Sequence, residues 1–186
     1  MSAVSAAEVT AITTWNIDPV HSTAQFKVKH MMISNVKGEF HGVKSSLILD
    51  SSDVTKSQVE ATIDVATIDT REQQRDTDLK SALFFDVAQF PTMTFKSTQI
   101  QKTGADTLAV SGDLTIHGVT HNVVLDVEGP SAPIKDPFEN TRIGLSATAR
   151  INRKDFGLTW NRVLESGGIL IGEEIVITLD LEFLKV

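Results

Sequence analysis

Histidine is the residue type in this sequence that most readily binds a metal ion, and there are five of them. His117 and His121 are four residues apart, but Gly118 places a turn between them, and the glutamate of the helical zinc motif is missing. Two more have one carboxylate nearby, namely His21 with Asp18 and His41 with Glu39. Neither pair recurs as a recognisable ligand set, so we predict no metal site.

Catalysis by an acid–base pair or a nucleophile has equally few candidates. Asp18, His21 and Ser22 are the residue types of a catalytic triad, but they crowd into a turn around Pro19, and a triad is defined by its geometry. The sequence has no cysteine, glycine-rich phosphate loop, nucleophile elbow or dinucleotide fingerprint. We predict no catalytic residue, and we do not expect an enzyme.

His30 differs from the other histidines because it lies on the apolar side of its predicted strand, with Phe26 and Val28. One interpretation is a core histidine whose ring nitrogens bond to backbone groups. The other is a polar contact for the headgroup of a ligand held inside the domain. No carboxylate lies near His30 on an inward face, and both interpretations stay open.

Length and charge exclude several classes of protein. The 186 residues suffice for one domain with a substantial core, and an apolar fraction of 41% is ordinary for a globular protein. The net charge of −7, without a basic block, argues against nucleic acid as a partner, and an anionic membrane surface repels such a chain on average. No apolar run approaches the roughly 20 residues of a membrane span.

Residues 1–14 are rich in Ala, Ser, Thr and Val, and they lack the basic and apolar regions of a secretory signal. We therefore expect a flexible N-terminal segment over 1–14, followed by one domain over 15–186. A cytoplasmic location is expected, with a periplasmic or secreted one as the alternative if a signal has been removed.

The elements that must position these residues are predicted to be β-strands. From Ile175 to Phe183 every second residue is large and apolar, which gives one apolar face and one wet face. The same signals predict eight strands, at 23–30, 36–49, 59–65, 92–100, 107–116, 119–128, 142–152 and 173–184. Within 36–49 the apolar residues change from even positions (Val36, Phe40) to odd positions (Leu47, Leu49), as they do at a β-bulge. Residues 129–140 hold three prolines and are predicted to form a loop.

One segment, 70–83, breaks this alternation and predicts an amphipathic helix. Thr70 and Gln73 have the spacing of a capping box, and Leu79, Ala82 and Leu83 would form a short apolar stripe. Arg75 and Asp76 on this helix are interpreted as a solvated or locally paired face. Phe84, Phe85 and Phe90 follow as an aromatic cluster.

Together these elements predict an all-β fold, an eight-stranded antiparallel up-and-down barrel with one inserted helix. The interior of such a barrel is filled by side chains or holds one slim ligand. Gly38, Gly42 and Gly112 stand where a packed core prefers bulk. They either make room for a ligand or relieve strain at the barrel corners.

The ordered motifs of the chain resemble the YceI-like family, lipocalin-like polyisoprenoid-binding proteins of bacteria. The resemblance covers Trp15 to Leu184 and rests on these segments: Trp15–Ser22, Val28–Ser34, Val36–Phe40, Ile68–Thr70, Arg75–Asp76, Leu79–Ser81, Phe84–Asp86, Phe90–Thr92, Thr94–Ser97, Gly112–Thr120 and Ile151–Leu158. It implies an elongated barrel with an apolar channel that holds a long amphiphile, such as an isoprenoid quinone, a polyprenyl chain or a fatty amide.

The family has no agreed catalytic residues, and its barrels often pair, so the resemblance implies a homodimer as one option. Two positions depart from its pattern. Asp78 stands where many relatives have His, and His121 stands where Lys or Arg is frequent. If either contacts a headgroup, specificity for that headgroup differs here.

From the apolar parity and the resemblance we predict a carrier of a long-chain lipid that needs no cofactor beyond that lipid. The predicted channel residues are Phe26, Val28, His30, Met32, Phe40, Ile63, Leu114, Leu145, Phe156, Leu158 and Trp160. Two rival functions are an enzyme acting on an isoprenoid or lipid, with His30 or Asp69 as acid–base groups, and a packed barrel that binds other proteins.

Overall fold

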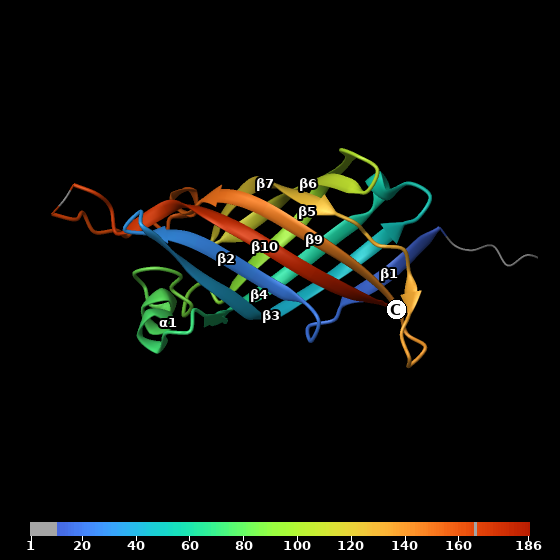
Figure 1. Ribbon diagram of the computed structural model, residues 1–186, viewed down its shortest axis with the longest axis horizontal. Coiled ribbons are helices and arrows are strands. Elements are labelled where there is room, and N and C mark those ends of the chain that lie inside the picture. The colour runs from blue at the N-terminus through green and yellow to red at the C-terminus, as the bar shows by residue number, and fades with distance from the viewer. Residues whose placement is uncertain (1–10, 166) are drawn as a thin grey trace, which may run out of the picture.

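The computed structural model describes residues 11–165 and 167–186 and shows an elongated antiparallel barrel with one helix (Figure 1). Its elements are β1 (Ile12–Ile17), β2 (Thr23–His30), β3 (Ser34–Asp50), a 3-10 turn (Val54–Lys56), β4 (Gln58–Asp69), α1 (Gln73–Lys80), β5 (Thr92–Lys102), β6 (Thr107–Ile116), β7 (Val119–Glu128), β8 (Ile134–Lys135), β9 (Thr141–Asn152), a second 3-10 turn (Arg153–Phe156) and β10 (Ile171–Lys185).

The sheet closes on itself with eight strand positions although it has ten strands. β1 and β2 share one position, because each pairs with β10 on one side and with β3 on the other. The chain leaves the sheet between them at the turn around Pro19. The opposite edge closes where β9 pairs with β10, and β8 only adds a two-residue extension to β9. The predicted eight-stranded barrel is therefore confirmed.

Two predicted irregular segments contain strands in the structure. Ile12 to Thr14, expected in the flexible segment, belong to β1, and the rest of that segment up to residue 10 lies outside the described residues. β8 lies within the predicted loop 129–140 because Ile134 and Lys135 pair with Arg142 and Thr141. β8 is an edge addition of two residues, which is too short for a period of two to reveal.

The helix is shorter than predicted and is not amphipathic. It begins at Gln73 after Glu72, whose carboxylate accepts the backbone N–H groups of Gln74 and Arg75, so Thr70 is not the capping residue. Only Leu79 of the expected apolar stripe lies in the helix. Thr70 instead ties α1 to β4, since its Oγ1 donates to Asp76 and accepts from Nε of Arg75. The local pairing of Arg75 and Asp76 thus runs through Thr70.

Long strands with bulges give the barrel its shape. The β3–β4 register shifts between Phe40 and Gly42, where the apolar parity predicted a bulge. Inward side chains then form three buried clusters along the barrel. The cluster at the end that carries β1 includes Trp15, Ile143 and Phe183, each at most 2% exposed. No helix among the described residues has the length and apolarity to cross a membrane.

Candidate functional site

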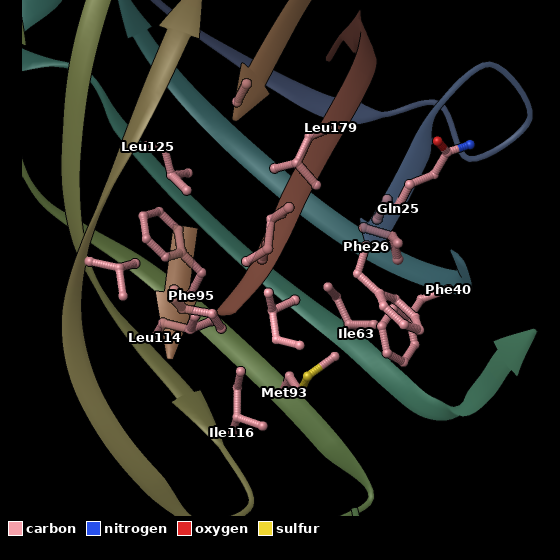
Figure 2. Close-up of a pocket in the computed structure, with 18 of the residues that line it drawn as sticks. Gln25, Phe26, Phe40, Ile63, Met93, Phe95, Leu114, Ile116, Leu125 and Leu179 are labelled. Carbon is pink, nitrogen blue, oxygen red and sulfur yellow. The ribbon is translucent and has the colours of Figure 1, made fainter. Parts of the chain in front are cut away.

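A cavity of about 490 Å³ runs through the middle of the barrel, within the size range of small-molecule sites. Its wall is almost entirely apolar because inward residues alternate with outward ones on every strand. Figure 2 shows side chains such as Phe40, Ile63, Leu114 and Leu179 converging on this space from different strands, whereas the polar end of Gln25 points away from it.

Ten of the eleven predicted channel residues line this cavity: Phe26, Val28, His30, Phe40, Ile63, Leu114, Leu145, Phe156, Leu158 and Trp160. Met32 does not. It lies in the turn after β2, with a backbone φ of 61°, and its side chain is 57% exposed. The prediction failed there because it continued the parity of β2 through a turn. Contact between the ten residues and a ligand remains a prediction.

The three glycines have local roles that the sequence left open. The ring of Phe26 lies over Gly38, its partner on β3, and a Cβ there would come within 2.5 Å of the ring. The ring of Phe95 covers Gly112 in the same way. Gly42 lies at the β3 bulge, beside Thr67. Two glycines therefore make room for phenylalanine rings of the wall, and the third serves the bulge.

The cavity is closed at one end and meets solvent at the other. At the closed end Leu49, Leu108 and Phe183 are buried, and Ile17, Val54 and Pro130 are half-buried. At the open end most of them are partly or fully exposed: Lys29, His30, Arg75, Asp78, Leu79, Phe84, Trp160, Leu170 and Ile171. This open end is the one with α1 and the loop that precedes β10 (Figure 1).

The charged side chains of the wall gather at this open end. His30 ends β2 there, and α1 contributes Arg75 and Asp78. Within the described ranges, the His30 ring makes no hydrogen bond to a protein group, which argues against a core histidine satisfied by the backbone. Asp78 accepts a hydrogen bond from Gln74 at 3.0 Å. Of the two departures from the family pattern, Asp78 lies at the cavity and His121 does not.

Arg153, which sequence reasoning missed, is a buried member of the wall. Its guanidinium donates to the carbonyl oxygens of Leu158, Trp160, Ile171 and Gly172. Burial lowers the pKa of Arg153 from its usual value, partly offset by the charge of Glu173. The sequence gives little indication that Arg153 is buried, because an arginine directly after a strand normally lies on the surface.

Two aromatic residues from different segments meet at the open end. The ring centroids of Phe84, which follows α1, and Trp160, which precedes β10, are 5.2 Å apart. Both line the cavity. This contact joins the α1 segment to the β9–β10 loop across the open end.

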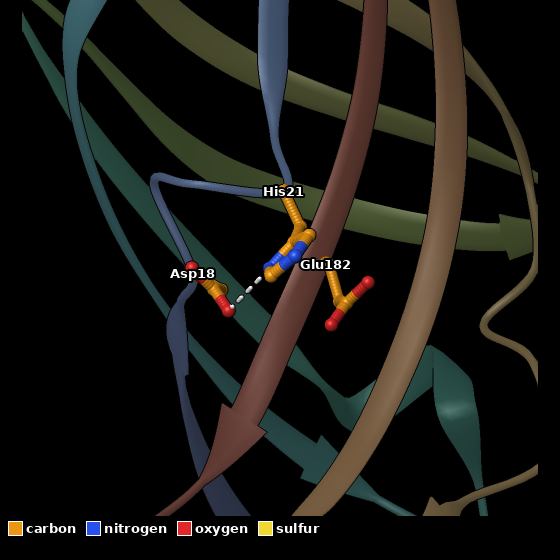
Figure 3. Close-up of side chains that lie close together, drawn as sticks. All are labelled: Asp18, His21 and Glu182. Carbon is orange, nitrogen blue, oxygen red and sulfur yellow. Dashed lines mark hydrogen bonds and ion pairs between the residues drawn. The ribbon is translucent and has the colours of Figure 1, made fainter. Parts of the chain in front are cut away.

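Outside the cavity, Asp18, His21 and Glu182 lie close together (Figure 3). Nδ1 of His21 is 2.9 Å from the Asp18 carboxylate, but Oγ of Ser22 bonds to the backbone of Glu182 and not to His21. The triad is therefore absent. Arg142 donates to both carboxylates and occupies the place that a cation would take. His21 and Arg142 hold the pKa of Asp18 well below its usual range.

The remaining histidines also lie outside the cavity. His41, at the β3–β4 register shift, lies 3.8 Å from Glu39 and 3.6 Å from Asp69, and all three are partly exposed. The rings of His117 and Phe90 are tilted against each other with centroids 4.5 Å apart, and Nε2 of His121 is 3.0 Å from the carbonyl oxygen of Asp155.

The structure does not bring together the acid–base groups named for the rival enzyme. Asp69 lies on the outer surface, where the backbone N–H of Arg71 and the nearby His41 lower its pKa. His30 lines the cavity. These two groups therefore cannot act on one substrate inside the barrel.

Comparison with known proteins finds relatives that are similar in sequence and in fold. The family model of the YceI-like domain matches residues 15–183. A UPF0312 protein of Staphylococcus epidermidis is 37% identical over 173 residues, which cover 92% of this chain and 98% of that protein. A UPF0312 protein of Staphylococcus aureus is 33% identical over the same shares of the two chains.

Two solved structures show the same architecture. The YCEI protein of Campylobacter jejuni superimposes with a TM-score of 0.72 at 29% identity, covering 86% of this chain and 91% of that one. A polyisoprenoid binding domain from Saccharophagus degradans gives a TM-score of 0.68 at 17% identity, covering 94% and 99%. With the family match across nearly the whole barrel, the chain belongs to the YceI-like family.

Proposed function

We propose that this protein binds and carries one long-chain amphiphilic lipid, of the isoprenoid quinone, polyprenyl or fatty amide type. The observation that supports this most strongly is the cavity, which has an almost entirely apolar wall, buried side chains such as Leu49 and Phe183 at one end, and its charged side chains near the other end. A molecule with an apolar tail and a small polar head matches that distribution. The lipid is the cargo, and no other cofactor is needed.

The energetics of transfer favour a chain over a compact ligand. Burying each CH₂ group contributes about 0.8 kcal/mol, so a tail gains affinity with its length and needs no specific polar contact. The tail would lie along Phe40, Ile63, Leu114 and Leu179 toward the closed end. The head would remain at the open end, within reach of His30, Arg75 and Asp78.

The rival functions have less support. A packed barrel acting as a protein-interaction module would have no need of a cavity of about 490 Å³. Of the two acid–base groups named for an enzyme, only His30 lines the cavity, and Asp69 lies outside it. The fold shared with a polyisoprenoid binding domain adds to the case for lipid.

The test is native mass spectrometry of the freshly purified protein, with analysis of its organic extract. The expected result is a one-to-one adduct that extracts as a single isoprenoid or fatty species. If the protein stays free of ligand after incubation with polyprenyl, quinone and fatty amide compounds, the proposal is wrong.

A matched pair of tryptophan variants locates the binding space. Leu114→Trp should fill part of the cavity and lower lipid occupancy, because Leu114 points inward. Asp113→Trp places the same ring on the outer face of β6 and should leave occupancy unchanged. Equal occupancy in both folded variants would place the lipid elsewhere.

A further inference from the structure

The β2–β3 hairpin ends in three exposed apolar residues, Met31, Met32 and Ile33, which we call the apolar tip. Their exposed fractions are 39%, 57% and 81%. Met31 and Met32 adopt consecutive left-handed conformations, with φ of 50° and 61°. Turns of this kind usually carry Gly, Asn or Asp, so an apolar sequence here combines backbone strain with exposed apolar surface.

The apolar tip is continuous with the open end of the cavity. His30, the residue before it, lines the cavity and pairs with Ile171, another lining residue. The backbone N–H of Met31 donates to the carbonyl oxygen of Leu170, which also lines the cavity. A surface that covers the apolar tip therefore also faces the route by which a ligand enters.

Three lysines lie on the two strands that lead to the apolar tip, although the chain as a whole is acidic. Lys27 and Lys37 are directly opposite each other on the outer face of the hairpin, and Lys29 lies between Lys27 and the tip. Within residues 11–165 and 167–186 none of the three lies within ion-pairing distance of a carboxylate. Like charges directly opposite each other destabilise a sheet, so an anionic partner would stabilise this arrangement.

Neighbouring carboxylates do not supply that partner. On β10, the strand beside β2, Glu173 pairs with Lys154 and Glu174 pairs with Arg150, both at 2.6 Å. The other end of the barrel has exposed apolar residues as well, such as Phe138, but that residue lies between Asp136 and Glu139. Apolar surface and unpaired positive charge thus coincide at the open end.

From this coincidence we propose that the apolar tip and its three lysines form a membrane-docking surface that sets the open end of the cavity on an anionic bilayer. Apolar side chains enter the interface between headgroups and acyl chains, while lysines attract anionic headgroups. The proposal deepens the proposed function, since a bilayer is then the source or destination of the carried lipid. Because the chain has a net charge of −7, the anionic bilayer repels the rest of the molecule. The protein therefore docks with the apolar tip toward the bilayer.

The test is co-sedimentation of the whole protein with phosphatidylcholine vesicles that contain phosphatidylglycerol, compared with vesicles of phosphatidylcholine alone. Binding is expected to the anionic vesicles and to weaken as sodium chloride is added. The double variant Met32→Ser/Ile33→Ser should bind about tenfold more weakly or worse. Phe138→Ser, an equally exposed apolar site at the other end, should bind as the wild type does.

A second pair tests the charge. Lys37→Gln should weaken vesicle binding about fivefold, since each lysine near an anionic surface contributes about 1 kcal/mol. Lys102→Gln, which removes one exposed lysine at the end of β5, should have no effect. Equal binding by Lys37→Gln and Lys102→Gln, or by the serine double variant and the wild type, would overturn the proposal.

Lipid occupancy from native mass spectrometry separates this proposal from the proposed function. Lost vesicle binding with normal occupancy in Met32→Ser/Ile33→Ser supports a docking surface distinct from the cavity. If the protein binds vesicles through the apolar tip but carries no lipid, the docking surface is supported and the carrier function is wrong. If the wild type ignores vesicles but forms a dimer in sedimentation velocity that the double variant abolishes, the tip binds a second copy and the membrane proposal is wrong.

Discussion

Nη1 of Arg153 donates a hydrogen bond to the carbonyl oxygen of Trp160 at 3.0 Å, so a buried guanidinium fixes the backbone beneath an aromatic residue of the open end. The same guanidinium bonds to Gly172 at 2.9 Å, at the start of β10. One side chain thereby joins the two ends of the β9–β10 loop. Trp160 owes its position at the cavity to this link.

Arg153→Lys should loosen that loop. A lysine ammonium cannot reproduce the planar fork of a guanidinium, so some carbonyl oxygens among Leu158, Trp160, Ile171 and Gly172 would lose their donor. We expect the free energy of unfolding in urea to fall by about 1–3 kcal/mol, with faster amide exchange across 157–171. Arg150→Lys, at an exposed surface pair with Glu174, should change it by less than about 0.5 kcal/mol. Equal effects would show that burial of Arg153 has no role.

Phe84 and Trp160 should control how fast a ligand leaves. An aromatic pair of this kind contributes about 0.5–1.5 kcal/mol, so Trp160→Ala should raise the dissociation rate of a bound lipid about 2- to 10-fold. Stopped-flow release of a dansyl-labelled farnesyl compound measures it. Phe84→Ala in the Trp160→Ala background should add little, because the partner ring is already gone. Additive increases from the two substitutions would mean that the rings act separately.

Much of this fold was predictable because apolar and polar residues alternate along a β-strand that has one buried and one exposed face. The alternation from Ile175 to Phe183 and the parity shift near Phe40 placed β10 and the β3 bulge correctly. The period of two breaks down in turns and in very short strands. That explains why Met32 was assigned to the wall and why the two-residue β8 was missed.

The open end was harder to predict because it is built from residues far apart in the sequence. Arg153 binds carbonyl groups on both sides of a long loop, and Phe84 meets Trp160 across 76 residues. Nothing in local spacing indicates such contacts. The glycine positions were recognised, but the rings that cover Gly38 and Gly112 belong to neighbouring strands, and only the register brings them together.

The loss of folding stability at acidic pH should depend on Asp18. The pKa of Asp18 is well below its usual value when folded, chiefly through its hydrogen bonds to His21 and Arg142. Its contribution is therefore complete above the unfolded pKa near 3.8 and is lost as the pH falls below that value. Asp18→Asn should be less stable than the wild type at pH 6, and the difference should shrink between about pH 4 and pH 2. Urea unfolding at each pH measures this difference.

A control for this profile is Asp180→Asn, an exposed carboxylate two residues before Glu182 on β10. It should follow the wild type at every pH, because surface substitutions away from special features change stability little. A difference between Asp18→Asn and the wild type that stays constant down to about pH 2 would mean that the charge of Asp18 is not what stabilises the fold.

Two glycine-to-alanine substitutions should show whether the barrel wall tolerates any added volume. At Gly112 a Cβ would overlap the ring of Phe95, so Gly112→Ala must displace that ring and should lower the free energy of unfolding by about 1–3 kcal/mol. At Gly144, on β9, the nearest atom to a Cβ is the Leu181 carbonyl oxygen at 3.8 Å, so Gly144→Ala should be neutral or slightly stabilising. Because the displaced Phe95 ring turns toward the cavity, Gly112→Ala should also reduce lipid occupancy, whereas Gly144→Ala should not. Urea unfolding and native mass spectrometry of both variants measure the two effects, and equal stability of the pair would refute the packing of Phe95 on Gly112.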